Sequence, residues 1–164
     1  MSTTQKNLMD AFAGESQANR KYLAYADKAA KEGFAQVAKL FRAAAHAETI
    51  HAHAHLRLAG KIHGTLENLE DAIAGETYEF TKMYPEMIKD AEAEGNAAAA
   101  NYMKWVNAVE EVHANLYKKA LAAKGQTESV DYYVCTVCGY THEGPHDGPC
   151  PVCNAAAKAF EKVA

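Results

Sequence analysis

Two pairs of residues with the same spacing carry most of the chemistry that this sequence offers. Glu48 and His51 lie three residues apart, and so do Glu110 and His113. On an α-helix this spacing places a carboxylate and an imidazole one turn apart on the same face. Each pair is therefore predicted to bind a metal ion.

A further acid precedes each pair at almost the same distance. Glu15 lies 33 residues before Glu48, and Glu76 lies 34 residues before Glu110. The local sequences also match, since Ala-Gly-Glu-Ser around Glu15 corresponds to Ala-Gly-Glu-Thr around Glu76. Single glutamates from two helices, with Glu-x-x-His from each of the other two, are the ligand pattern of di-iron and di-manganese four-helix bundles. The sequence therefore predicts a dinuclear metal site built by a duplicated helical hairpin.

The register of the apolar residues indicates where these acids lie. In four segments, apolar residues recur at alternating steps of three and four, which is the spacing of a buried helix face. Each acid falls in the middle of such a stripe, and the stripes include Val37, Leu58, Leu66, Met87 and Tyr117. Because burial of an unpaired carboxylate is very unfavourable, four glutamates in a helical core require cations to neutralise them.

Glu79 adds a carboxylate one turn after Glu76, at a place where the first half of the duplication has Ala18. It is either a seventh ligand or a side chain that faces solvent. As a ligand, Glu79 could replace His51 on one iron, because ferric iron prefers carboxylate whereas ferrous iron tolerates imidazole.

Two tyrosines are candidates for contact with the metal ligands. Tyr22 lies two turns beyond Glu15, and Tyr102 lies two turns before Glu110. Either phenol could hydrogen-bond a ligand carboxylate. Both could equally be core aromatics.

All four cysteines lie near the C-terminus. Cys135 and Cys138 form one Cys-x-x-Cys pair, and Cys150 and Cys153 form another. Four thiolates in this arrangement bind one tetrahedral metal ion, and zinc and iron both accept that geometry. A module of about 33 residues buries little apolar surface, so the metal is expected to stabilise it. Gly139 and Asn154 follow the two pairs, and both residue types can adopt the left-handed conformation that such a knuckle needs.

The rest of the chain is organised to position these residues. Ala-, Glu- and Lys-rich sequence favours helix as far as residue 124. Four helices are predicted, over Gln5–Lys31, Phe34–Ala59, Thr65–Ala93 with an interruption at Pro85, and from beyond Asn96 to Lys124. We therefore expect an all-α four-helix bundle in residues 1–124, a linker at 125–131 and a small metal-knuckle domain at 132–164.

The connection between the second and third helices poses a geometric question. In a ferritin-like bundle these helices are parallel, so the connection must return along the bundle by about 28 Å. The residues between Ala59 and Thr65 span only about 17 Å when fully extended. Either the bundle is a plain up-down array, or hairpins are exchanged between two chains of a dimer. We favour the exchange.

Composition excludes several classes of protein. The net charge of −4 gives no basic surface for nucleic acid. No apolar run approaches the length of a membrane span, and the N-terminus lacks the apolar region of a signal peptide. Two Cys-x-x-Cys pairs indicate metal binding in a reducing cytoplasm rather than disulfides.

Taken together, these motifs resemble the rubrerythrin family over nearly the full length. The matching segments are Ala11-Phe-Ala-Gly-Glu-Ser16, Ala47-Glu-x-x-His51-Ala52, Gly75-Glu-Thr-x-Glu79, Met83-Tyr-Pro85, His113-Ala-x-Leu-Tyr117 and the Cys-x-x-Cys-Gly-Tyr…Cys-Pro-x-Cys ending. Asn154 departs from the usual glycine after the last cysteine. The short connection also resembles that of rubrerythrins whose dimers exchange hairpins.

This resemblance implies a non-haem di-iron peroxidase that reduces hydrogen peroxide to water and protects cells from oxidative stress. By position, Glu48 and Glu110 would bridge two irons. Glu15, with Glu79 or His51, would complete the coordination of one iron, and Glu76 with His113 would complete that of the other. Manganese or zinc could take the place of iron in this site. The cysteines would hold a rubredoxin-type iron, with zinc as the alternative. Electrons would come from NAD(P)H through a reductase or a separate rubredoxin. We expect a homodimer or small homo-oligomer. Because the linker would hold the cysteine module away from its own bundle, electrons are expected to pass from the four-cysteine iron of one subunit to the di-iron site of the other.

Three other functions use similar residues. A ferroxidase or iron-storage subunit would share the bundle but would not need the cysteines. An electron carrier without catalytic activity would hold zinc or iron in the cysteine site. An oxidase would act on molecular oxygen in place of peroxide.

Overall fold

A computed structural model describes residues 2–163, which form two compact units. The first unit ends at His63 and the second begins at Gly64. Because the boundary falls between the two predicted hairpins, the assignment of residues 1–124 to one domain stays a prediction.

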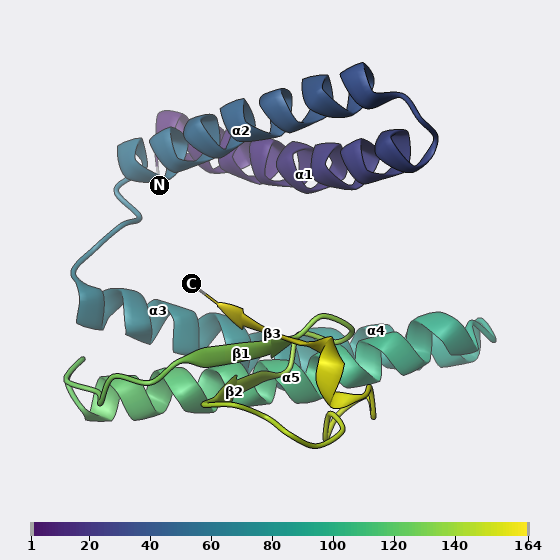
Figure 1. Cartoon of the computed structure of the whole chain (residues 1–164). Coiled ribbons are helices and arrows are strands. Elements are labelled where there is room, and N and C mark those ends of the chain that lie inside the picture. Colours follow the sequence, from purple (N-terminus) through teal and green to yellow (C-terminus); the bar gives the residue numbers. More distant parts are fainter. Residues whose placement is uncertain (1, 164) are drawn as a thin grey trace. The chain divides into compact units, whose positions relative to one another are not determined.

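The first unit is a helical hairpin of α1 (Thr3–Lys31) and α2 (Ala35–Leu58), which run antiparallel along each other (Figure 1). The Ser2 hydroxyl accepts a hydrogen bond from the Gln5 amide, and the Gln5 side chain accepts one from the Ser2 amide. This capping box starts α1 two residues before the predicted Gln5. Gly33, at φ 86°, makes the turn that ends it. Small side chains fill the contact between the helices, namely Ala26, Ala29, Ala38, Ala45 and Ala52.

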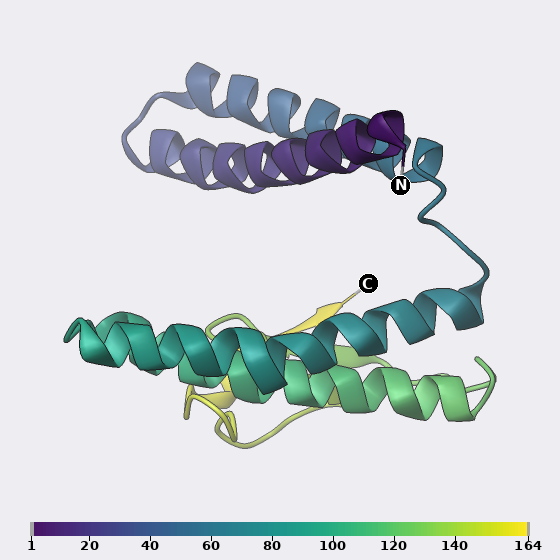
Figure 2. The ribbon, with the colours of Figure 1, turned by 180° about the vertical axis from the view of Figure 1, so that it is seen from behind.

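The second unit begins with three helical elements that lie along α5 (Ala97–Ala122). These are α3 (Thr65–Tyr78), a π-helical turn η1 (Glu79–Met83) and α4 (Tyr84–Ala93). Figure 2 shows α3 and α4 as one nearly continuous rod beside α5. Pro85 cannot donate the backbone hydrogen bond that an α-helix would need at this point, and the wider π turn accommodates that loss. The predicted interruption is thus confirmed, and it takes the form of a π turn.

A small antiparallel sheet completes the second unit. Its strands β1 (Tyr132–Cys135), β2 (Thr141–Glu143) and β3 (Phe160–Val163) are ordered β2-β1-β3, with a 3-10 turn η2 (Ala157–Ala159) before β3. The module packs on α5, where Val109 lies in one apolar cluster with three of the cysteines (Figure 1). A mostly helical chain followed by this strand-containing knuckle confirms the predicted fold class.

The apolar stripes are more exposed than the sequence predicts. Val37, Leu58, Leu66, Met87 and Tyr117 are all exposed, and Leu58 retains 72% of its accessible surface. The physical reason is that each hairpin buries one side of its helices and leaves the other side of the stripe uncovered. A bundle of four helices would require a second hairpin on each of these faces.

No helix within residues 2–163 combines the length and apolar character needed to cross a bilayer.

Candidate metal centres

The first hairpin brings together the three predicted ligands Glu15, Glu48 and His51. Glu15 comes from α1, and the other two lie one turn apart on α2. His51 Nδ1 lies 2.9 Å from Glu48 Oε2 and 3.9 Å from Glu15 Oε1. This group has one imidazole and two carboxylates in position to bind one divalent cation.

The second unit contains a group with almost identical geometry. His113 Nδ1 lies 2.8 Å from Glu110 Oε2 and 3.9 Å from Glu76 Oε1. Glu76 is on α3, whereas Glu110 and His113 are one turn apart on α5. In both groups the potential ligand atoms lie within 4.8 Å of one another. The repeated distances support the duplication predicted from the spacing.

The electrostatics of the second group fit a bound cation. Burial raises the pKa of Glu76, the charge and hydrogen bond of the neighbouring Glu110 carboxylate raise it further, and His113 opposes these effects. Two carboxylates in such proximity repel each other unless a positive charge lies between them. A divalent ion bound by Glu76, Glu110 and His113 removes that repulsion.

Glu79 is the first residue of the π turn and is half-buried. Burial and the charge of Glu76 raise the pKa of Glu79, and His113 lowers it. Glu79 therefore interacts with the second group, although it lies outside the set of three atoms that converge. Its role as a ligand stays a prediction.

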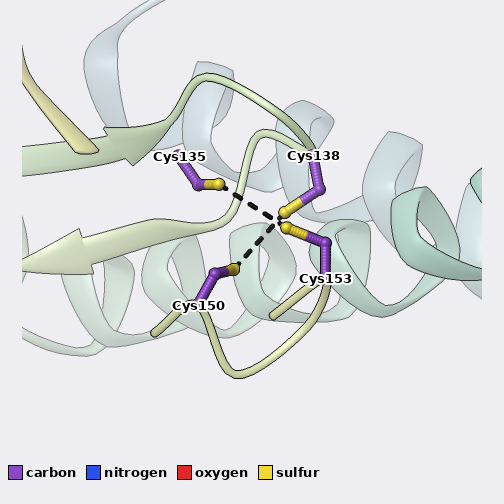
Figure 3. A group of neighbouring side chains, drawn as sticks. All are labelled: Cys135, Cys138, Cys150 and Cys153. Atoms are coloured by element: carbon purple, nitrogen blue, oxygen red, sulfur yellow. Dashed lines mark hydrogen bonds between the residues drawn. The ribbon is translucent and has the colours of Figure 1, made fainter. Parts of the chain in front are cut away.

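The cysteine site fits a tetrahedral metal ion closely. All four Sγ atoms converge between the two knuckle loops (Figure 3). The Cys135 and Cys153 sulfurs are 3.7 Å apart, and the Cys138 and Cys150 sulfurs are 3.6 Å apart. A tetrahedral metal with bonds of 2.3 Å requires sulfurs separated by about 3.8 Å. The observed distances are within 0.2 Å of that value.

Backbone amides surround the sulfurs. Burial opposes ionisation of Cys135, but hydrogen bonds from the Val137 and Cys138 amides lower its pKa below the usual value. Burial raises the pKa of Cys138 and of Cys153. Burial of several thiolates without a cation is unfavourable, so bound metal is what allows all four to ionise.

The knuckle turns form as predicted. Gly139 and Asn154 adopt left-handed conformations, at φ 87° and 60°. Their amides donate hydrogen bonds to the carbonyls of Cys135 and Cys150.

The cysteine module also contacts the second carboxylate–histidine group. His113 Nε2 lies 3.0 Å from Thr141 Oγ1, the first residue of β2. Beside this contact is a cavity of about 370 Å³ whose walls are mainly apolar, formed in part by Leu69, Leu116, Tyr117 and Tyr132. The module is therefore adjacent to helix α5 of its own chain, whereas we expected the linker to hold it away.

Comparison with known proteins identifies the family. The model of the rubrerythrin family matches residues 6–121, and that of the rubrerythrin rubredoxin-like domain matches residues 133–161. The chain belongs to the rubrerythrin family. Nigerythrin from Nitratidesulfovibrio vulgaris is 35% identical to this chain over 168 residues, which cover 92% of the chain and 82% of that relative. The rubrerythrin of Porphyromonas gingivalis is 34% identical, with 99% and 90% covered.

Solved structures give the same result for this rubrerythrin-family chain. Nigerythrin in a partially reduced state matches 99% of the chain and 88% of its own, with a TM-score of 0.60 and 32% identity. A structure of fully reduced, all-ferrous nigerythrin also has a TM-score of 0.60. The chain thus combines the carboxylate–histidine ligands of a rubrerythrin with its four-cysteine rubredoxin-like site.

Tyr84 and Tyr117, whose pKa values the second group affects, were predicted only as members of matching segments or an apolar stripe, with no role at the metal site. Burial and the charges of Glu110 and Glu76 raise the pKa of Tyr84, and burial with the same two charges raises the pKa of Tyr117. Helical spacing was an available signal for Tyr117, which follows His113 by one turn.

The two tyrosines that the sequence did single out lie elsewhere. Tyr22 packs in an aromatic cluster with Tyr25 and Phe41. Tyr102 is 53% exposed and interacts electrostatically with Tyr84. Contact of Tyr22 or Tyr102 with a metal ligand stays a prediction.

Proposed function

We propose that this protein is a non-haem di-iron peroxidase that reduces hydrogen peroxide to water. The observation that carries the proposal is the contact between the cysteine module and the second carboxylate–histidine group. A four-thiolate site of the electron-transfer type packs against α5, and its module touches His113, a ligand of the catalytic type. A metal store would have no use for such a contact.

Iron is the metal we propose for both sites, because a structure of the similar nigerythrin is described as all ferrous. We propose that Glu48 and Glu110 bridge two irons and that Glu15, with Glu79 or His51, completes one of them. Glu76 and His113 then complete the other. The third iron is bound by Cys135, Cys138, Cys150 and Cys153.

When bound by these residues, two ferrous ions would together supply the two electrons that, with two protons, reduce hydrogen peroxide to two waters without a one-electron step that releases hydroxyl radical. The protein balances the charge of these ions with its glutamates and excludes bulk water with the apolar faces around them. A phenol is protonated at neutral pH, and burial with the charges of Glu76 and Glu110 favours that form further by raising the pKa of Tyr84 and Tyr117. Each phenol can then donate a hydrogen bond to an oxygen atom beside Glu76 and Glu110.

A complete site requires both hairpins, because each provides only three of the convergent ligands. The exposed stripes of the two units give apolar surfaces that can cover each other. The six residues between α2 and α3 are too short for the return that a parallel arrangement needs, since they span about 20 Å at most. We propose that α1–α2 of one chain pairs with α3–α5 of its partner, in a homodimer or small oligomer.

In this arrangement, electron transfer across subunits means transfer from the cysteine module of one chain to a di-iron site formed by both chains. The cysteine module of one chain contacts His113 of the same chain through Thr141. In an exchanged dimer, the di-iron site at that His113 is completed by Glu15 and Glu48 of the partner. The electron therefore reaches a site that both subunits share.

We further propose that electrons come from NADH through a reductase or a separate rubredoxin, and that the protein works in a reducing cytoplasm, where its cysteines stay reduced and available to bind metal. Iron storage or oxygen reduction by the same bundle is the alternative. A particle of dimeric size in light scattering would argue against iron storage. Faster consumption of peroxide than of oxygen would argue against oxygen reduction as the main reaction.

The test is peroxide consumption by the iron-loaded protein with a reductase, a rubredoxin and NADH. Glu110→Ala is expected to abolish it, because removal of a bridging carboxylate destroys the site. Glu111→Ala is the matched control, since the neighbouring residue is exposed and lies outside the site. Equal activity of Glu110→Ala and the wild type would refute the proposal.

A further inference from the structure

His113 is held from both sides of its imidazole ring. Nδ1 faces Glu110 Oε2 at 2.8 Å, while Nε2 faces Thr141 Oγ1 at 3.0 Å. The first contact is within α5, whereas the second reaches 28 residues along the chain into the cysteine module. We infer that Thr141 is a positioning residue that selects the metal-binding nitrogen of His113 and couples the cysteine module to the di-iron site. This inference rests on the proposed function, in which His113 binds iron.

The hydrogen bonds of Thr141 determine which nitrogen is free. Its hydroxyl lies 3.2 Å from the Gly139 carbonyl oxygen, which has no proton and can only accept. With a metal on Nδ1, Nε2 would carry the ring proton and donate it to Oγ1, while the Thr141 hydroxyl donates to the Gly139 carbonyl. In the neutral imidazole this leaves the lone pair on Nδ1. Nδ1 is the nitrogen that lies beside Glu110 and Glu76, where a metal would bind.

The first hairpin provides an internal comparison. His51 has the same Nδ1 geometry toward Glu48 and Glu15. The side chain of His51 is 53% exposed, against 27% for His113, and the contact with Thr141 belongs to His113. We infer that this contact fixes the ring of His113 more firmly than that of His51.

The position of Thr141 depends on the fold of the knuckle. Gly139 directly follows Cys138, and its left-handed conformation places its carbonyl next to Thr141. A side chain at Gly139 would contact Val109 of α5, one residue before Glu110. The loop that holds the cysteine metal is thus the loop that orients Thr141. Loss of that metal is expected to release His113.

The experiment compares Thr141→Val with Thr141→Ser in the full-length protein loaded with Zn²⁺, a diamagnetic probe. Valine keeps the β-branched shape of threonine and its preference for strands but removes the hydroxyl; serine keeps the hydroxyl. In spectra of protein labelled with ¹⁵N-histidine, the wild type and Thr141→Ser should show a slowly exchanging Nε2 proton on His113. Thr141→Val should lose that signal.

Chelator competition gives the second readout, with the metal in the cysteine site as an internal reference. Removal of a hydrogen-bond partner of a metal-bound histidine lowers affinity by about 10- to 100-fold. Thr141→Val is therefore expected to release the carboxylate-bound zinc at least about 10-fold more readily, and Thr141→Ser to match the wild type.

Three results would contradict either the role of Thr141 or the proposed metal site. A Thr141→Val protein that keeps both the protected proton and the wild-type affinity contradicts the role of Thr141. If Thr141→Val disrupts the fold of the module, the test depends on Thr141→Ser. A folded Thr141→Ser protein with weakened zinc binding would also contradict the role of Thr141. Failure of the wild type to bind zinc through His113 would instead refute the proposed metal site.

Discussion

Two inactive variants are expected to restore activity to each other when they are combined in one dimer. Glu48→Ala removes a ligand from α2, and Glu110→Ala removes one from α5. Each variant alone is expected to be inactive, because every di-iron site then lacks one bridging carboxylate. If hairpins are exchanged, a heterodimer of the two contains one site with both lesions and one site with neither.

The size of the effect follows from this geometry. Heterodimers purified through two different affinity tags should have about half the activity of the wild type, because one of their two sites is intact. The assay is peroxide-dependent oxidation of NADH in the presence of a reductase and a rubredoxin. The di-iron sites should also hold half the iron of the wild type, while the cysteine iron stays unchanged, which gives a readout independent of the electron donors.

The matched control places both lesions on the same hairpin. A heterodimer of Glu48→Ala with Glu15→Ala has a damaged α1–α2 hairpin in every site, so it should stay inactive whether or not hairpins are exchanged. An inactive Glu48→Ala and Glu110→Ala heterodimer that is otherwise folded and dimeric would refute the exchange. Four helices of one chain would then form each site.

Two further predictions concern the cysteine module. Cys150→Ser should abolish the red colour of a ferric tetrathiolate site, which a visible spectrum measures. In this variant peroxide should oxidise the reduced di-iron site once, and re-reduction of that site should be slower than in the wild type, as measured by rapid mixing. Val109 is 2% exposed and packs against the cysteine loops. Val109→Ala should therefore lower the free energy of unfolding by about 2 kcal/mol in a denaturant titration of the zinc-loaded protein. The control is Val130→Ala, at a position 42% exposed, which should change stability by less than about 0.5 kcal/mol. A similar loss at both positions would show that Val109 does not hold the module to α5.

Local sequence signals were enough to predict the helices but not the strands of the C-terminal module, and most residues predicted as ligands converge in three groups. Glu-x-x-His fixes the distance between Glu48 and His51 because both lie on one helical turn, and the structure brings Glu15 to them across the α1–α2 contact. The cysteine loops are equally local, and Gly139 and Asn154 take the conformations that their residue types favour. The break near Pro85 was predictable from its missing amide.

Contacts between distant segments could not be predicted in this way. Nothing local to Thr141 indicates that its hydroxyl meets His113, because that contact depends on how the module packs on α5. The influence of Glu110 on Tyr84 likewise depends on the path of the chain through the π turn. The exposure of Leu58 and Leu66 is likewise not readable from local sequence, and we propose that a partner chain covers these residues.

The most direct test of the central claim is rapid mixing of the fully reduced, iron-loaded protein with hydrogen peroxide, while the visible absorbance of the tetrathiolate iron is followed. We predict that peroxide is consumed and that the ferric absorbance returns within the same mixing experiment, as the cysteine iron re-reduces the oxidised pair. Consumption of peroxide with no return of that absorbance would contradict the coupling between the two sites. A protein that leaves peroxide unchanged would contradict the peroxidase itself.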